Sequence, residues 1–159
     1  MTMKLYFFRH GLAEEGVDME DAKRALTKEG QERTKAAAKA LESLDVRPTW
    51  LYSSPLVRAY QTADILAPAL KQKVTIREEL APGFGVAQVE AIIQALGDDD
   101  DVMFVGHEPD FSTIVGKLTG GSVMMKKGGL ARVDVVSRQP LLGTLVWLLP
   151  PKVLSAVKE

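Results

Sequence analysis

The chain contains two histidines, and each one directly follows an apolar run of strand length. His10 comes after the run 5–8 and Arg9, and His107 comes after the run 102–105 and Gly106. Continuous apolar runs of this length are typical of strands covered on both faces in a parallel sheet. Ligands of such sheets bind beyond the carboxyl ends of the strands. One histidine there is as readily a solvated loop residue, but two favour a functional site at one sheet edge.

Two arginines are placed for the same edge. Arg9 directly precedes His10, and Arg58 lies one turn into a helix that we expect to begin at Ser54. Guanidinium groups, imidazoles and a helix N-terminus that face one crevice form an anion site, and the arginine fork suits a tetrahedral phosphoryl group. Arg58 taken alone would be interpreted as an exposed helix residue paired with a carboxylate. The whole set predicts a phosphoryl-binding crevice.

The elements that must position these residues alternate between strands and helices. Strands are predicted from apolar runs at 5–8, 50–52, 74–76 and 102–105. Helices are predicted after Thr27, as an N-cap, and at 54–70, 86–96 and 109–118. The alternating segments 131–136 and 145–149 predict a final strand pair. We therefore expect an α/β fold, a three-layer α/β/α sandwich with a mainly parallel central sheet and an antiparallel edge, in a single domain over residues 1–159.

The composition excludes several function classes. The 159 residues are 46% hydrophobic and 26% charged, as in an ordinary globular domain. Cysteine is absent, which removes thiolate chemistry, disulfides and cysteine-bound zinc and fits a reducing compartment. The 20 basic and 21 acidic residues give a net charge of −1, so we expect no nucleic-acid and no membrane partner. Without a signal-type or transmembrane run, the expected location is cytoplasmic.

Other site types have weaker support. The run Asp98–Asp101 could form a metal cluster with His107 and Asp110, but it precedes a strand whose other end carries His107, so we interpret it as a solvated turn. The glycines near 83–85 and 116 fit neither a dinucleotide loop nor a P-loop. We therefore expect no metal and no cofactor.

The basic pair Lys126-Lys127 has two interpretations. The two lysines could contact a phosphoprotein, whereas the ordinary interpretation is a charged turn before a strand.

Four segments resemble motifs of the histidine phosphatase superfamily, the phosphoglycerate mutase-like proteins. They are Arg9-His10-Gly11 (the RHG motif), residues 24–30, residues 53–63, and residues 106–109. They occur in the family's order and span nearly the whole chain. The short chain, the compact loop 80–83 and the ending 147–152 resemble the SixA-type phosphohistidine phosphatases within that superfamily. The resemblance implies a phosphoglycerate mutase-like fold with a minimal lid.

The resemblance also implies roles for particular residues. His10 would be the nucleophile and form a phosphohistidine intermediate. Arg9, Arg58 and His107 would be catalytic and bind the phosphoryl oxygens, with Gly11 as a further phosphate-binding residue. No metal would be required.

A general acid is the feature that this sequence does not provide clearly. Superfamily members that act on alkyl phosphates carry an inserted helical lid and an acid in the loop after the third strand. The expected position falls near Pro82, which cannot donate a proton, and we interpret the adjacent Glu79 as a solvated turn residue that could serve as the acid. Without an acid, the favoured substrate is phosphohistidine on signalling or phosphotransfer proteins, so the reaction is protein dephosphorylation. Whether the loop 18–21 closes over the site stays open.

Two alternative functions remain. The first is a small-molecule phosphomonoesterase or mutase of the same superfamily, which would act on a small phosphate ester and need an acid such as Glu79. The second is a phosphate-binding or partner-binding module without turnover. The presence of both histidines and both arginines argues against this module, because a binder needs no nucleophile.

Overall fold

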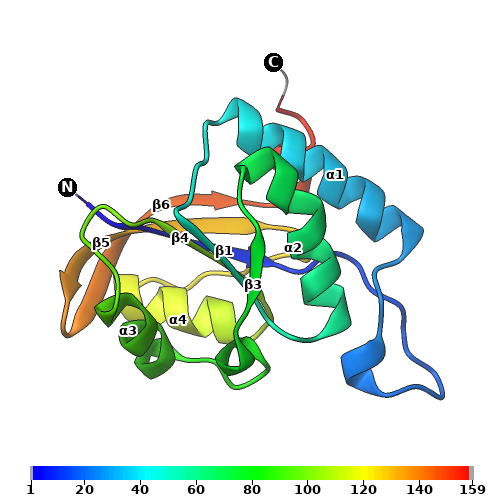
Figure 1. Cartoon of the computed structure of the whole chain (residues 1–159), viewed down its shortest axis with the longest axis horizontal. Helices are drawn as coiled ribbons and strands as arrows, with labels where there is room; N and C mark the ends of the chain where they lie inside the picture. Colours follow the sequence, from blue (N-terminus) through cyan, green and yellow to red (C-terminus); the bar gives the residue numbers. More distant parts are fainter. Residues whose placement is uncertain (1, 158–159) are drawn as a thin grey trace.

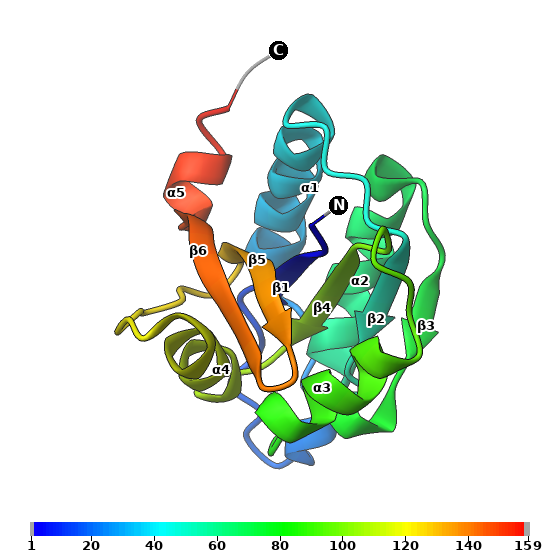
Figure 2. The ribbon, with the colours of Figure 1, turned by 90° about the vertical axis from the view of Figure 1, so that its left-hand side faces the viewer.

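A computed structural model of the chain describes residues 2–157. Its strands form one six-stranded sheet in the order β3-β2-β4-β1-β5-β6, and Figure 2 shows the strands following one another in this order. The strands are β1 Lys4–Arg9, β2 Trp50–Ser53, β3 Val74–Ile76, β4 Val102–Gly106, β5 Leu130–Arg138 and β6 Leu141–Leu149. The first four pair in parallel, β5 pairs antiparallel with β1, and β6 pairs antiparallel with β5. The predicted mainly parallel sheet with an antiparallel edge is confirmed.

Helices cover both faces of this sheet. They are α1 Lys28–Ser43, α2 Val57–Leu70, α3 Val86–Gln94, α4 Asp110–Thr119 and α5 Pro151–Leu154, with short 3-10 turns η1 Asp21–Lys23 and η2 Glu78–Leu80. α1, α2 and α5 lie on one side of the sheet and α3 and α4 on the other (Figures 1 and 2). This confirms the three-layer sandwich.

Two apolar cores lie between the sheet and its helices, one on each face of the sheet, because successive side chains along a strand point to opposite faces. Phe7 and Phe104 pack toward Phe111 of α4, while Phe8 packs with Leu41 of α1 and with the apolar face of α2. The central strands β1 and β4 are buried on both faces, which explains their continuous apolar runs.

The two helices that flank the candidate site begin differently. Thr27 is the N-cap of α1, as predicted, and its hydroxyl accepts a hydrogen bond from the Gly30 N–H at 2.9 Å. The prediction that the second helix begins at Ser54 is wrong, since α2 begins at Val57. The Ser54 hydroxyl accepts from the Leu56 N–H at 3.2 Å, and this local turn replaces the first helical turn.

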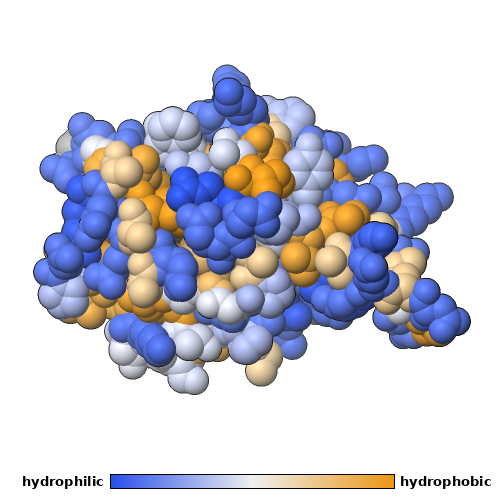
Figure 3. All heavy atoms as spheres, turned by 60° about the horizontal axis from the view of Figure 1, so that its bottom comes forward, coloured by the Kyte–Doolittle hydropathy of each residue, from blue (hydrophilic) through white to orange (hydrophobic). Residues whose placement is uncertain are grey.

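The final strand pair is longer than expected. β5 and β6 extend over nine residues each and meet at a tight turn around Gln139 and Pro140. Within residues 2–157, no helix has the length and apolar character needed to cross a lipid bilayer. The face in Figure 3 is largely hydrophilic, with apolar residues in small patches between polar ones.

Candidate active site

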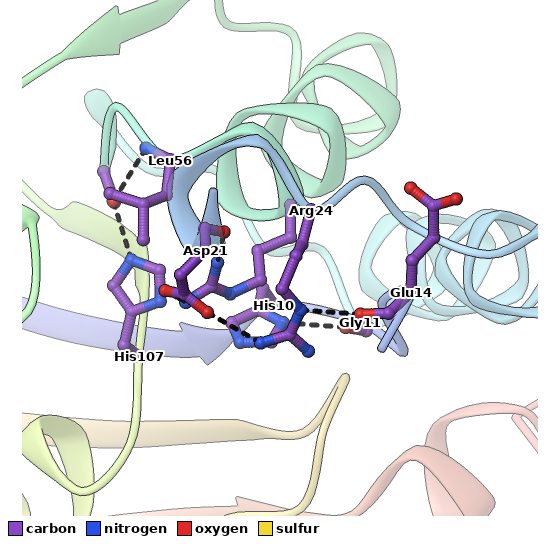
Figure 4. Close-up of polar contacts among 9 residues, drawn as sticks. His10, Gly11, Glu14, Asp21, Arg24, Leu56 and His107 are labelled. Carbon is purple, nitrogen blue, oxygen red and sulfur yellow. Dashed lines mark hydrogen bonds and ion pairs between the residues drawn. The ribbon is translucent and has the colours of Figure 1, made fainter. Parts of the chain in front are cut away.

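The two histidines lie side by side at the carboxyl edge of the sheet, as predicted. The parallel register of β1 and β4 pairs Arg9 with Gly106, and the His10 N–H continues it by donating to the Gly106 carbonyl at 3.0 Å. The two imidazole centroids are 5.4 Å apart, and His10 and His107 are only 6% and 3% exposed. Figure 4 shows both rings together with Asp21.

The local hydrogen bonding of His10 determines its tautomer. Its Nδ1 lies 2.7 Å from the Gly11 carbonyl oxygen. Because a carbonyl only accepts, Nδ1 must carry the proton, and Nε2 therefore keeps its lone pair. Burial lowers the pKa of His10 to about 3 against the opposing effect of the Gly11 carbonyl, and the charges of neighbours, including Arg58, lower it further. His10 is thus a neutral imidazole with the electronic form of a nucleophile at neutral pH.

Gly11 positions His10 through its backbone. Its carbonyl accepts from His10, and its N–H donates to the Thr62 hydroxyl at 3.1 Å. Thr62 in turn donates to the Arg58 carbonyl at 2.7 Å, which links the loop to α2. A Cβ at position 11 would come within 2.9 Å of the Thr34 hydroxyl oxygen, so a side chain there would force Thr34 to shift. The Gly11 N–H thus bonds to Thr62 in this structure, and the contact between Gly11 and phosphate stays a prediction.

His107 is held by Ser54, the residue at which the sequence predicts the start of a helix. Its Nε2 lies 2.7 Å from the Ser54 hydroxyl oxygen. Burial lowers the pKa of His107 to about 4, with a further contribution from Arg58 and an opposing one from Asp21. Among residues 2–157 its buried Nδ1 has no hydrogen-bond partner. A ligand oxygen can supply that partner.

Arg58 binds an acidic side chain that sequence reasoning did not assign to the site. Arg58 is 7% exposed, and its guanidinium donates to the Asp21 carbonyl at 2.8 Å and to the Asp21 carboxylate at 3.1 Å. Arg24 binds the other carboxylate oxygen at 2.9 Å. Hydrogen bonds from Arg24 and then Arg58 hold the pKa of Asp21 below its usual range. The acidic loop therefore reaches the site. The Asp21 carboxylate accepts a hydrogen bond from the Arg58 guanidinium, the group that we predict to bind phosphate.

The loop that carries Asp21 is fastened at its base. Ala13 and Leu26 form an isolated antiparallel bridge, and the Glu14 N–H donates to the Ala25 carbonyl at 2.8 Å. The Arg24 Nε–H donates to the Glu14 carbonyl at 2.6 Å (Figure 4). Beyond this base the segment between β1 and α1 projects from the body of the protein (Figure 1). The ends of the loop are thus restrained, while Asp21 at the start of η1 contacts Arg58.

Arg9 is oriented by a chain of polar contacts from α4. It donates to the Met125 carbonyl at 2.8 Å, and the Met125 N–H donates to the Ser112 hydroxyl at 3.3 Å. Ser112 is held by the Glu108 carboxylate, which accepts its N–H at 2.8 Å. Burial lowers the pKa of Arg9, and the Glu108 charge opposes this effect. The buried Nε of Arg9 has no partner among the described residues, so this guanidinium has donor capacity for an anion.

The contacts of Glu79 argue against its suggested role as a general acid. Its carboxylate accepts from Arg77 at 2.8 Å, and the Arg77 guanidinium also lies over the Tyr52 ring, 5.0 Å from its centroid. The hydrogen bond from Arg77 lowers the pKa of Glu79. A general acid needs the opposite shift in order to hold a proton near neutral pH.

The acidic run Asp98–Asp101 is a turn at the opposite end of β4 from His107, as expected. Asp101 accepts the Lys4 N–H at 2.8 Å, and Asp98 pairs with Arg138 at 3.3 Å. Throughout residues 2–157, no group of three or more histidine, aspartate or glutamate side chains is arranged to hold a metal ion.

The buried neutral histidines make stability depend on pH. The folded protein lowers the pKa of His10 to about 3 and that of His107 to about 4, from 6.5. Below pH 6.5 the unfolded chain therefore binds protons that the folded protein does not. The free energy of unfolding should fall as the pH decreases from about 6.5 toward 4, while above 6.5 these groups contribute no slope.

Urea unfolding at a series of pH values measures this slope. The double variant His10→Gln, His107→Gln should show a shallower slope, by up to about two protons, in the same pH range. Equal slopes for the two proteins would contradict the assignment of buried neutral histidines.

Comparison with known proteins gives matches along the sequence. The sequence profile of the histidine phosphatase superfamily (branch 1) matches residues 5–88. An uncharacterized protein of Picosynechococcus sp. is 36% identical over 165 residues, which cover 93% of this chain and 100% of that protein. Phosphohistidine phosphatase SixA of Escherichia coli K12 is 27% identical over 161 residues, which cover 98% of this chain and 99% of SixA.

Solved structures extend the likeness to the fold. A structure of the protein histidine phosphatase SixA complexed with tungstate superimposes with a TM-score of 0.84 at 27% identity, covering 94% of this chain and 98% of that one. A mycobacterial glucosyl-3-phosphoglycerate phosphatase has the same fold, with a TM-score of 0.72 at 18% identity over 92% of this chain and 99% of its own. The chain is therefore a phosphatase that belongs to the histidine phosphatase superfamily, and it is similar to SixA along nearly its whole length.

Proposed function

We propose that this phosphatase removes the phosphoryl group from phosphohistidine on proteins, with His10 as the nucleophile. The observation that carries the proposal is the neutral His10 ring, whose Nδ1–H is held by Gly11 while Nε2 keeps its lone pair. The whole-length similarity to SixA, a phosphohistidine phosphatase, supports the choice of substrate.

The reaction has two steps on the same phosphorus atom. In the first, His10 Nε2 forms a bond to phosphorus while the bond from phosphorus to the substrate imidazole breaks. That imidazole leaves as a neutral ring when its other nitrogen carries a proton. In the second step, water attacks the phosphorus of phosphohistidine 10 and its proton goes to the released phosphate, so the lone pair returns to Nε2.

Electrostatic stabilisation comes from the groups around His10. Arg9 and Arg58 bind phosphoryl oxygens, and His107 hydrogen-bonds to them as charge redistributes. The unpartnered Arg9 Nε–H and His107 Nδ1 are the buried polar atoms with capacity for these bonds. These side chains supply the positive charge and the donors that the transferred group requires.

The leaving group distinguishes the possible substrates. An alkoxide needs a proton from a general acid, whereas an imidazole leaves phosphorus without one. The carboxylates that the sequence and the site offer, Glu79 and Asp21, both have a lowered pKa because arginines bind them. They are ionised near neutral pH, and this favours a phosphohistidine substrate over a phosphate ester.

The test compares substrates under metal-free conditions. The purified, EDTA-treated protein is given a phosphotransfer domain phosphorylated on histidine and, separately, a panel of small phosphomonoesters. We expect kcat/KM to be at least about 100-fold higher for the phosphohistidine domain, since a missing general acid costs esters about that factor. Preference for a metabolite would indicate a small-molecule phosphatase or mutase, and no turnover would indicate a binding module.

Removing the Asp21 carboxylate should strengthen phosphate binding. In the Asp21→Asn variant, Arg58 no longer has a charged partner that competes with phosphate. The Asp21 side chain is 63% exposed, and an exposed ion pair contributes about 1 kcal/mol at most, so we expect up to about a five-fold lower Kd for inorganic phosphate. Isothermal titration calorimetry at pH 7 measures this change.

Glu20→Gln is the matched control for Asp21→Asn. Glu20 lies on the same loop and pairs with Lys23, so the variant loses one negative charge without changing a contact of Arg58. Its Kd for phosphate should equal that of the unmodified protein. Equal affinities in both variants would show that Asp21 does not compete with phosphate.

A further inference from the structure

A groove with basic walls adjoins the site. Its volume is about 540 Å³, and its lining includes Arg9 and Gly11, the two neighbours of His10 in the chain. We call it the basic groove, and its other lining residues are Leu12, Arg33, Thr34, Lys126, Lys127, Gly128, Pro150, Pro151 and Lys152. The groove therefore lies beside the segment that carries His10.

The charge of this groove is of one sign. Four basic side chains beyond Arg9 line it, from α1, from the segment before β5 and from α5, and among residues 2–157 no aspartate or glutamate does. Arg33 pairs with Glu29 at 2.7 Å. Within the part of the chain that the structure describes, Lys126, Lys127 and Lys152 form no ion pair. These three lysines are available to an acidic ligand.

The lysines are held next to the nucleophile by the backbone. The Gly128 N–H lies 3.0 Å from the carbonyl oxygens of both Arg9 and His10, and the Arg9 N–H donates to the Gly129 carbonyl at 3.0 Å. These bonds attach the segment 126–129 directly to the loop that carries His10. The position of Lys126 and Lys127 is thus determined by the same backbone that positions the catalytic imidazole.

Part of the groove lining, and the surface that extends it, is apolar. Leu12, Pro150 and Pro151 form part of its surface. A second cavity of about 180 Å³ shares Lys126 and Pro150 with it and continues the surface past Met124, which is 70% exposed. Apolar walls with lysines around them suit a polypeptide that presents acidic side chains beside apolar ones.

We propose that the basic groove binds an acidic segment of the protein substrate, adjacent to its phosphohistidine. The inference rests on the proposed function and specifies the substrate class of the same site. Its lysines are exposed, and the buried Thr34 hydroxyl already donates to the Gly30 carbonyl at 2.7 Å. A small ligand is normally oriented by fixed polar groups in its pocket, whereas exposed lysines spread along a groove match carboxylates spread along a polypeptide.

The test uses phosphohistidine peptides of equal length with acidic, neutral or basic flanking residues. The protein should show a kcat/KM about ten-fold higher for the acidic peptide than for the neutral one, and added salt should reduce this preference. The triple variant Lys126→Glu, Lys127→Glu, Lys152→Glu should lose the preference. Its hydrolysis of free phosphohistidine should stay unchanged, because that substrate has no flanking carboxylates for the three lysines to bind.

The matched control is the triple variant Lys39→Glu, Lys73→Glu, Lys117→Glu. These exposed lysines lie outside the groove, and the variant has the same change in net charge. It should keep the preference for the acidic peptide. If both triple variants lost the preference equally, the groove proposal would be overturned, and the preference would be a long-range effect of net charge.

The outcomes separate this inference from the proposed function. If free phosphohistidine is hydrolysed and flanking charge has no effect, the groove proposal is wrong and the proposed function stands. If no phosphohistidine compound is hydrolysed, the proposed function fails, and fluorescence anisotropy with a labelled, unphosphorylated acidic peptide still tests the groove. Binding that is lost only in the groove variant would support it, and absent binding, or a stronger response to a small bisphosphate, would overturn it.

Discussion

Replacing His10 with alanine is expected to abolish turnover and phosphoenzyme formation. The variant has no lone pair at the position of Nε2, so phosphorus has no nucleophile on the protein. Loss of a nucleophile typically lowers kcat by about 10⁴-fold or more. Rapid quenching with a ³²P-labelled phosphohistidine domain measures the intermediate as acid-labile label on the protein, and steady-state release of phosphate measures turnover.

His107→Asn is the matched comparison for His10→Ala. It changes the second buried histidine, which lies 5.4 Å from the first between ring centroids, and it leaves the nucleophile in place. We expect slower but detectable phosphoenzyme formation, because only part of the electrostatic stabilisation is lost. Urea unfolding at pH 7 verifies that each variant is folded. Labelled phosphoenzyme in folded His10→Ala would refute the assignment of the nucleophile.

Arg58→Ala should weaken phosphate binding and transition-state stabilisation more than it weakens the fold. The guanidinium of the buried Arg58 bonds only to Asp21 among the described residues, and the apolar face of α2 packs into the core without it. Removal of one such donor typically lowers kcat by about 10²- to 10³-fold. Hydrolysis of the phosphohistidine domain and calorimetry with inorganic phosphate measure both effects.

Two further variants define what Arg58 contributes. Arg24→Ala also removes a partner of Asp21 but retains the Arg58 guanidinium, so it should keep phosphate affinity. Arg58→Lys retains the charge without the planar fork and should fall between the native protein and Arg58→Ala. Unchanged phosphate affinity in Arg58→Ala would remove this arginine from the site.

The sequence by itself determined the architecture and the main members of the site. The runs 5–8 and 102–105 are apolar on both faces, and this local pattern is enough to predict buried parallel strands with His10 and His107 at one edge. Thr27 was recognisable as an N-cap because capping depends on residues within one turn. These predictions succeeded because periodicity and capping are local properties of the chain.

Other features of the site were decided only by contacts between distant parts of the chain. Asp21 reaches Arg58 across 37 positions, and Ser54 reaches His107 across 53. No local pattern distinguishes Asp21 from its acidic neighbours or Ser54 from a helix cap, because the partner of each polar group depends on how the layers pack.

The same reason applies to the protonation state of His10 and to the basic groove. The lowered pKa of His10 comes first from burial, which exists only in the packed protein. Arg33, Lys126 and Lys152 come from three separate segments that the sheet and its two flanking helices bring together. Local sequence specified which residues were available for chemistry, and tertiary packing decided their partners, their proton positions and the surface beside them.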